Sequence, residues 1–128
     1  MRLLQSALFL VLMLTPVAVV SARLTLSEDG RTDYVIVTPL EPSPSVVRAA
    51  SELQAFLGQI TGAVYRIVTE KAPIREHEIV LGAPRRLAAR GVTIDIPALG
   101  PEGYVLKTIE GTLVVAGSDV RGVMYGVY

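Results

Sequence analysis

The 128-residue sequence has no cysteine, no tryptophan and a single histidine. Without cysteine the chain forms neither disulfides nor thiolate metal sites, and one histidine would leave a catalytic zinc ion dependent on carboxylate ligands. Basic and acidic residues number 12 each, so neither sign of charge is in excess. A neutral domain without a basic stripe has no electrostatic attraction for nucleic acid or anionic lipid, and we expect neither as a partner.

The first 22 residues have the pattern of a secretory signal peptide. Arg2 precedes the almost wholly apolar stretch 3–20, and small residues fit a cleavage site between Ala22 and Arg23. The alternative is an uncleaved membrane anchor, although polar residues and Pro16 interrupt the stretch. Cleavage predicts a secreted or periplasmic protein without stable membrane insertion, in which residues 23–128 form one domain.

One amphipathic helix is expected directly after a proline-rich loop. Ser43 is a suitable N-cap, Pro44 suits the first helical position, and Gly62 is a natural left-handed C-cap. Between them, apolar residues recur at steps of three and four, which predicts one face in the core. The residues on this predicted core face are Val46, Ala49, Ala50, Leu53, Phe56, Leu57 and Ile60.

Five strands are expected from short runs rich in β-branched and other apolar residues. They cover 33–38, 64–68, 78–82, 104–109 and 112–116, and Glu110-Gly111 forms a tight hairpin turn between the last two. A short helix is expected at 84–90, an irregular segment at 93–99, and a last helix from about Asp119. This order predicts a mixed α/β sandwich with helices packed on one face of a sheet.

Two motifs carry parts of known catalytic or binding signatures. His77-Glu78 begins like a zinc-protease motif, but Leu81 stands where the second histidine should be, so we expect a solvated His77. The segment 117–122 has the glycine spacing of a phosphate loop, but the residues that should follow are replaced by Val123 and Met124. A structural role is favoured for its glycines, since glycines four residues apart let another backbone approach closely.

The acidic residues near the C-terminal end do not form a recognisable catalytic pair. Glycoside hydrolysis needs two carboxylates facing each other across the scissile bond. Glu110 belongs in a turn, Asp119 at a helix cap, and Glu102 at a strand entrance. We therefore assign no catalytic residue, no metal site and no cofactor to this chain.

An ordered set of segments resembles a known module: 46–62, 78–82, 100–106, 113–117 and the closing Arg-Gly-Val-Met-Tyr-Gly-Val-Tyr. The set resembles the small domain that precedes the catalytic barrel in secreted glycoside hydrolases, including α-glucuronidases and bacterial β-N-acetylhexosaminidases. The resemblance implies an α+β fold, with a mostly antiparallel or mixed sheet and helices on one face, similar to a zinc-protease (zincin-like) scaffold without its metal site.

The resemblance also implies the function of the module. It is a non-catalytic domain in polysaccharide breakdown, truncated here at its final helix, and the catalytic carboxylates lie on a following (β/α)8 barrel. Only an interdomain packing role is carried over, to Gly122, Tyr125, Gly126 and Tyr128. The identity of the sugar stays open.

A stand-alone secreted module that binds a glycan or a protein is the alternative. Its contacts would be exposed aromatic rings, because such rings stack on sugars and anchor interfaces. The candidates are Tyr65, Tyr104, Tyr125 and Tyr128.

Overall fold

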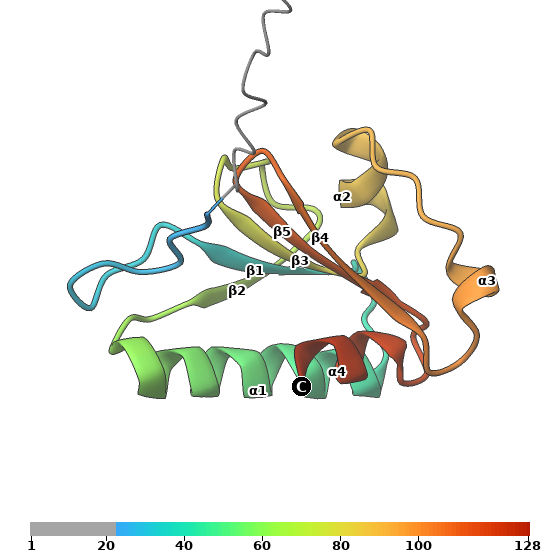
Figure 1. Cartoon of the computed structure of the whole chain (residues 1–128), viewed down its shortest axis with the longest axis horizontal. Coiled ribbons are helices and arrows are strands. Elements are labelled where there is room, and N and C mark those ends of the chain that lie inside the picture. The colour runs from blue at the N-terminus through green and yellow to red at the C-terminus, as the bar shows by residue number, and fades with distance from the viewer. Residues whose placement is uncertain (1–22) are drawn as a thin grey trace, which may run out of the picture.

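The computed structural model describes residues 23–128, which form one sheet with helices on both sides (Figure 1). Along the chain the elements are β1 (Val35–Thr38), α1 (Pro44–Thr61), β2 (Arg66–Thr69), β3 (Glu78–Leu81), α2 (Pro84–Ala89), α3 (Ile96–Leu99), β4 (Tyr104–Ile109), β5 (Thr112–Gly117) and α4 (Gly122–Val127).

The sheet has five strands in the order β2-β1-β3-β5-β4. The pairs β1–β2, β1–β3 and β3–β5 are parallel, and only the hairpin β4–β5 is antiparallel. The α+β fold and the mixed sheet are confirmed, whereas a mostly antiparallel sheet is not what forms. The cause is that a helix or a long segment separates the parallel partners, and such crossovers return the chain in the same direction.

Two apolar cores lie on opposite faces of the sheet. On one face Ile36, Ile79 and Val115 pack with α1 and α4, which lie side by side beneath the strands in Figure 1. The alternate residues of the same strands form the second core, which Leu87 of α2 and Val92 help to cover. Helices were expected on one face only, which describes α1 and α4 but not α2. Strands buried on both faces are typical of parallel sheets covered by crossover segments.

The long helix begins and ends where the sequence predicts. The Ser43 hydroxyl accepts the N–H of Val46 at 3.3 Å, and Gly62 is left-handed (φ 74°) with its N–H on the carbonyl of Gly58. Val46, Ala49 and Ala50 are buried. However, Phe56 and Ile60, expected in the core, are exposed, because no described segment covers that part of α1.

Three other predicted segments differ in detail from the structure. β2 begins at Arg66, and Val64, placed in that strand by its alternating pattern, is exposed. The segment expected to be irregular contains α3, a single turn whose N-terminus is capped by the Asp95 carboxylate. α4 begins at Gly122, three residues after Asp119.

The hairpin turn between β4 and β5 forms as predicted. Glu110 and Gly111 both have positive φ, at 43° and 83°. Two consecutive residues with positive φ are what a two-residue hairpin turn of matching twist requires.

Replacing Ser43 with alanine should lower the free energy of unfolding by about 1 kcal/mol, the usual cost of a lost helix cap. The Ser43 hydroxyl also donates to the carbonyl of Asp119 at 2.8 Å, so the variant should loosen the start of α4 as well. Urea denaturation measures the loss, and the exposed Ser51→Ala in the same helix is the control. A loss equal to that of the control would contradict the capping role.

Candidate functional site

The glycines of α4 pack against this domain's own sheet. A Cβ atom on Gly122 would lie 2.4 Å from the carbonyl oxygen of Gly103, and one on Gly126 would lie 2.6 Å from a methyl group of Val115. The predicted close approach is therefore present, but its partners are β4, β5 and the turn before β4. Gly122 and Gly126 thus pack within the domain, and the interdomain role expected of them stays a prediction.

The tyrosines proposed as contact residues separate into two groups. Tyr65 is fully buried and its hydroxyl donates to the carbonyl of Leu26 at 3.1 Å, so it is not available to a ligand. Tyr104, Tyr125 and Tyr128 are exposed. Since Tyr104 also lies beside Gly126, this ring flanks α4. A contact with another domain or a glycan stays a prediction for these three.

Tyr128 is tied to α1 by its hydroxyl. A hydrogen bond from Tyr128 lowers the pKa of Glu52, and the Arg48 side chain contributes in the same direction. The hydrogen bond to Glu52, followed by burial, raises the pKa of Tyr128 itself. Arg48 and Glu52 also form an exposed ion pair of 2.9 Å. The end of α4 thus lies beside the middle of α1, with which α4 is in contact.

The loop with phosphate-loop spacing uses its N–H groups internally. The N–H of Gly122 donates to the Ser118 hydroxyl, and the N–H of Val123 donates to the Ser118 carbonyl, both at 3.3 Å. Ser118 thus accepts from the first two residues of α4 through its hydroxyl and its carbonyl. Amides already engaged in the turn are poor donors for an anion, which favours the structural role of this loop.

The three acidic residues considered for hydrolysis lie in different settings. Glu102 forms an exposed ion pair of 2.7 Å with Arg121, and Glu110 stands in the hairpin turn. Asp119 is exposed and borders a mainly apolar hollow of about 530 Å³ at the ends of β3 and β5, which Leu87 and Ile96 also line. Of the three, Asp119 borders a hollow, whereas Glu102 is engaged with Arg121.

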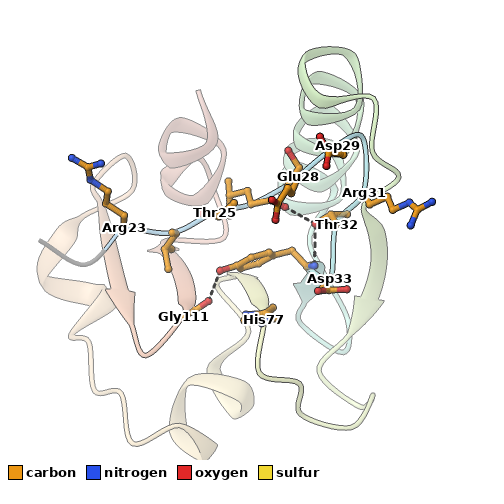
Figure 2. A pocket seen from close by; sticks show the side chains of 13 residues that line it. Arg23, Thr25, Glu28, Asp29, Arg31, Thr32, Asp33, His77 and Gly111 are labelled. Carbon is orange, nitrogen blue, oxygen red and sulfur yellow. Dashed lines mark hydrogen bonds between the residues drawn. The ribbon is translucent and has the colours of Figure 1, made fainter.

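A second hollow, of about 810 Å³, lies between the segment 23–33 and the start of the sheet (Figure 2). The ring of Tyr34 lies within it, 5.1 Å from the ring of His77, and its hydroxyl donates to the Gly111 carbonyl at 2.7 Å. His77 is half-buried, not solvated as expected, and among the described residues its Nδ1 has no hydrogen-bond partner. This hollow is built around a tyrosine that anchors the hairpin turn.

Ionisation of the Tyr34 hydroxyl should lower the free energy of unfolding at high pH. Burial, followed by the charge of Glu76, raises the pKa of Tyr34 above its usual 10.0. A raised pKa means that the neutral form is favoured in the folded state, so its contribution is complete below about pH 10 and is lost as pH rises through the folded-state pKa.

The variant Tyr34→Phe removes this titration and the hydrogen bond to Gly111. It should be about 1 kcal/mol less stable than the wild type at neutral pH, and the difference should shrink as pH rises above about 10. Urea denaturation at several pH values measures this difference. A difference that grows with pH would contradict the assignment.

A buried charge cluster around Glu78 was not predicted from the sequence. Glu78 is fully buried, with its carboxylate 3.5 Å from Arg86 and 2.8 Å from Arg90. The carboxylate also accepts the N–H of Arg75 at 3.0 Å. The available signal was a glutamate at the start of an apolar run, with arginines eight and twelve residues later. The cluster ties α2 to β3 by setting two arginines around one carboxylate, and among the described residues the Arg86 Nε has no hydrogen-bond partner.

Three further features of residues 23–128 concern metal ligands, membrane-spanning helices and the predicted cleavage site. Within this range no group of three or more candidate metal ligands is brought together. None of the helices described in this range is long and apolar enough to cross a membrane. Arg23, on one side of the predicted cleavage site, is exposed, and Ala22 lies outside the described residues.

Comparison with known proteins identifies the domain. Residues 24–128 match the family described as Glycosyl hydrolase family 67 N-terminus. No curated protein matches the chain. The match runs from the segment before β1 through α4, and it confirms the resemblance to the front domain of α-glucuronidase-type enzymes. The chain therefore belongs to the glycosyl hydrolase family 67 N-terminal family and is the N-terminal domain of a glycoside hydrolase.

Proposed function

We propose that this is a non-catalytic accessory domain of an exported α-glucuronidase-type enzyme, which supports a linked catalytic barrel in polysaccharide breakdown. The family match over residues 24–128 carries the proposal. Export is inferred from the signal-peptide pattern of residues 1–22, and it gives a secreted or periplasmic location.

The described residues support a role other than catalysis. Glycosidases place two carboxylates on either side of the scissile bond, about 5 to 10 Å apart. Glu102 is engaged with Arg121, and Glu78 is enclosed by arginines in the interior. Neither carboxylate is free to protonate a leaving group or attack a sugar. The reaction is therefore assigned to the linked domain.

The exposed aromatic residues support contact with that domain. Tyr125 lies on α4, Tyr128 directly follows this helix, and Tyr104 lies on the neighbouring edge strand β4. Exposed tyrosines on adjacent elements are typical of interface anchors, because each ring buries a large area at little entropic cost. We place the linked domain on this side of the molecule.

The chain alone should release no product from aryl glucuronides. The expected rate for rigorously purified chain equals that of buffer, and the linked enzyme provides the positive control. Turnover that persists through purification and is lost on replacement of a carboxylate in residues 23–128 would contradict the non-catalytic role.

Glycan binding by the same tyrosines is the second candidate, favoured by the exposure of Tyr104, Tyr125 and Tyr128. A glycan-binding surface predicts saturable binding in a glycan panel that is abolished by Tyr125→Ala. A flat response across the panel would leave only the packing role.

A further inference from the structure

The apolar stripe of α1 is covered at one end and uncovered at the other. Phe56 and Ile60 follow Ala49 by seven and eleven residues, or about two and three helical turns, so the three lie on one side of the helix. Ala49 is fully buried, but Phe56 is 54% and Ile60 79% exposed. A helix face whose sequence pattern is uniform therefore loses its cover partway along.

The cover over Ala49 is α4, which runs beside α1 in the same direction (Figure 1). The Ser43 hydroxyl meets the carbonyl of Asp119 at the start of both helices. The two helices stay in contact from there on, and Tyr128, which follows α4, lies close enough to Glu52 to lower the pKa of that carboxyl. Phe56 is one turn beyond Glu52, and Ile60 is two turns beyond it. The line of α4 therefore points along the uncovered part of the stripe.

The sheet, on the other side of α4, also has an apolar surface that this helix covers only in part. Gly122 lies against Gly117 of β5, and Gly126 lies against Val115. Four residues of the helix therefore run past two residues of the strand, and each of these stretches is about 6 Å long. One more turn in this direction would reach Leu113. Leu106, which pairs with Val115 and so shares its face, is 56% exposed.

We propose that Phe56 and Ile60 of α1, with Leu106 and Leu113 of the hairpin, form a docking surface for an amphipathic helix that continues the line of α4. The occupant is a segment of the same polypeptide, supplied with the linked catalytic part of the glycoside hydrolase. The proposal rests on the proposed function, because it names the segment through which the two parts meet. About nine helical residues, or about 14 Å, would span the distance from Glu52 to Thr61.

Continuity with an existing interface selects this occupant. The uncovered surface extends the packing of α4 on α1 and β5 without a break, and Ala49 already shows how the stripe is buried there. An amphipathic helix buries its apolar face against its neighbours. Here the two side chains of α1 would contact that face from one side, and the two of the hairpin from the other. A second copy or an unrelated protein would have to enter beside the end of α4, where Tyr128 already lies.

Cysteine labelling tests the proposal, because residues 1–128 contain no cysteine of their own. Phe56→Cys and Ile60→Cys are made in the 128-residue chain and in the native polypeptide that carries this domain. The matched control is Val47→Cys, since Val47 is 52% exposed and lies on the opposite side of α1. The rate of alkylation by iodoacetamide is measured at each introduced position by peptide mass mapping.

Both test positions should react about tenfold or more slowly in the native polypeptide than in the 128-residue chain, while the control reacts at the same rate in both. Equal rates at Ile60→Cys, or a native polypeptide that ends at Tyr128, would overturn the proposal. Hydrolysis of glucuronosyl substrates by the native polypeptide is measured separately. Protection without hydrolysis would support the docking surface and contradict the proposed function.

Discussion

Replacing Glu78 with glutamine should lower the free energy of unfolding by about 3 to 5 kcal/mol, as expected when one member of a buried ion cluster is removed. The Arg86 side chain is only 1% exposed, so its charge cannot be hydrated after the carboxylate is neutralised. Arg86 also donates to the carbonyl of Ala72 at 2.6 Å, and this bond holds the guanidinium inside. The connection between β3 and α2 should therefore unfold at lower urea concentration.

Glu102→Gln is the matched control for this prediction. Its ion pair with Arg121 is short, at 2.7 Å, but both side chains are about half exposed. Exposed pairs contribute about 0 to 1 kcal/mol. If Glu78→Gln costs no more than this control, the buried cluster does not stabilise the fold.

Replacing Gly122 with alanine should cost about 1 to 3 kcal/mol, the usual penalty for overpacking. The added methyl group would meet the Gly103 carbonyl at 2.4 Å and the backbone of Gly117 at 3.1 Å. Backbone atoms cannot rotate away, so α4 has to move off the sheet. Circular dichroism during thermal unfolding measures the loss.

Gly58→Ala is the control, because it is also a helical glycine but has room for a methyl group, whose nearest atom would be 3.5 Å away. Alanine is favoured over glycine in a helix interior by about 1 kcal/mol. The control should therefore raise the midpoint while Gly122→Ala lowers it. Equal shifts would mean that close approach of α4 to the sheet is not required.

Local chemistry explains which parts of the fold could be predicted from sequence. Ser43, Pro44 and Gly62 determine the ends of α1 through bonds to their own neighbours in the chain. The turn at Glu110-Gly111 needs only two residues with positive φ. These features require no knowledge of the rest of the molecule.

Strand direction and the burial of side chains depend on distant segments. The apolar run Glu78–Leu81 has the same sequence whether its neighbours are parallel or antiparallel, so the pairing of β3 with β1 and β5 could not be derived. Phe56 and Ile60 fit the helical period as well as Ala49 does, and only the position of α4 separates them. Periodicity identifies an apolar face but not what covers it.

The candidate site was predictable to the same degree. The spacing of Gly122 and Gly126 indicated a close approach, and the structure supplies its partners in β5 and the turn before β4. Tyr65 looked equivalent to the other tyrosines in sequence, yet its ring is enclosed beneath α1 and the segment that contains Leu26. Only the exposed Tyr104, Tyr125 and Tyr128 stay as contact candidates.

The most direct test of the account is to isolate the native polypeptide with an antibody raised against residues 23–128 and to measure both its mass and its hydrolysis of glucuronosyl substrates. We expect a mass several times the 13.7 kDa of this chain, with release of glucuronic acid by the captured protein. A captured protein of about 13.7 kDa that releases no sugar would contradict it.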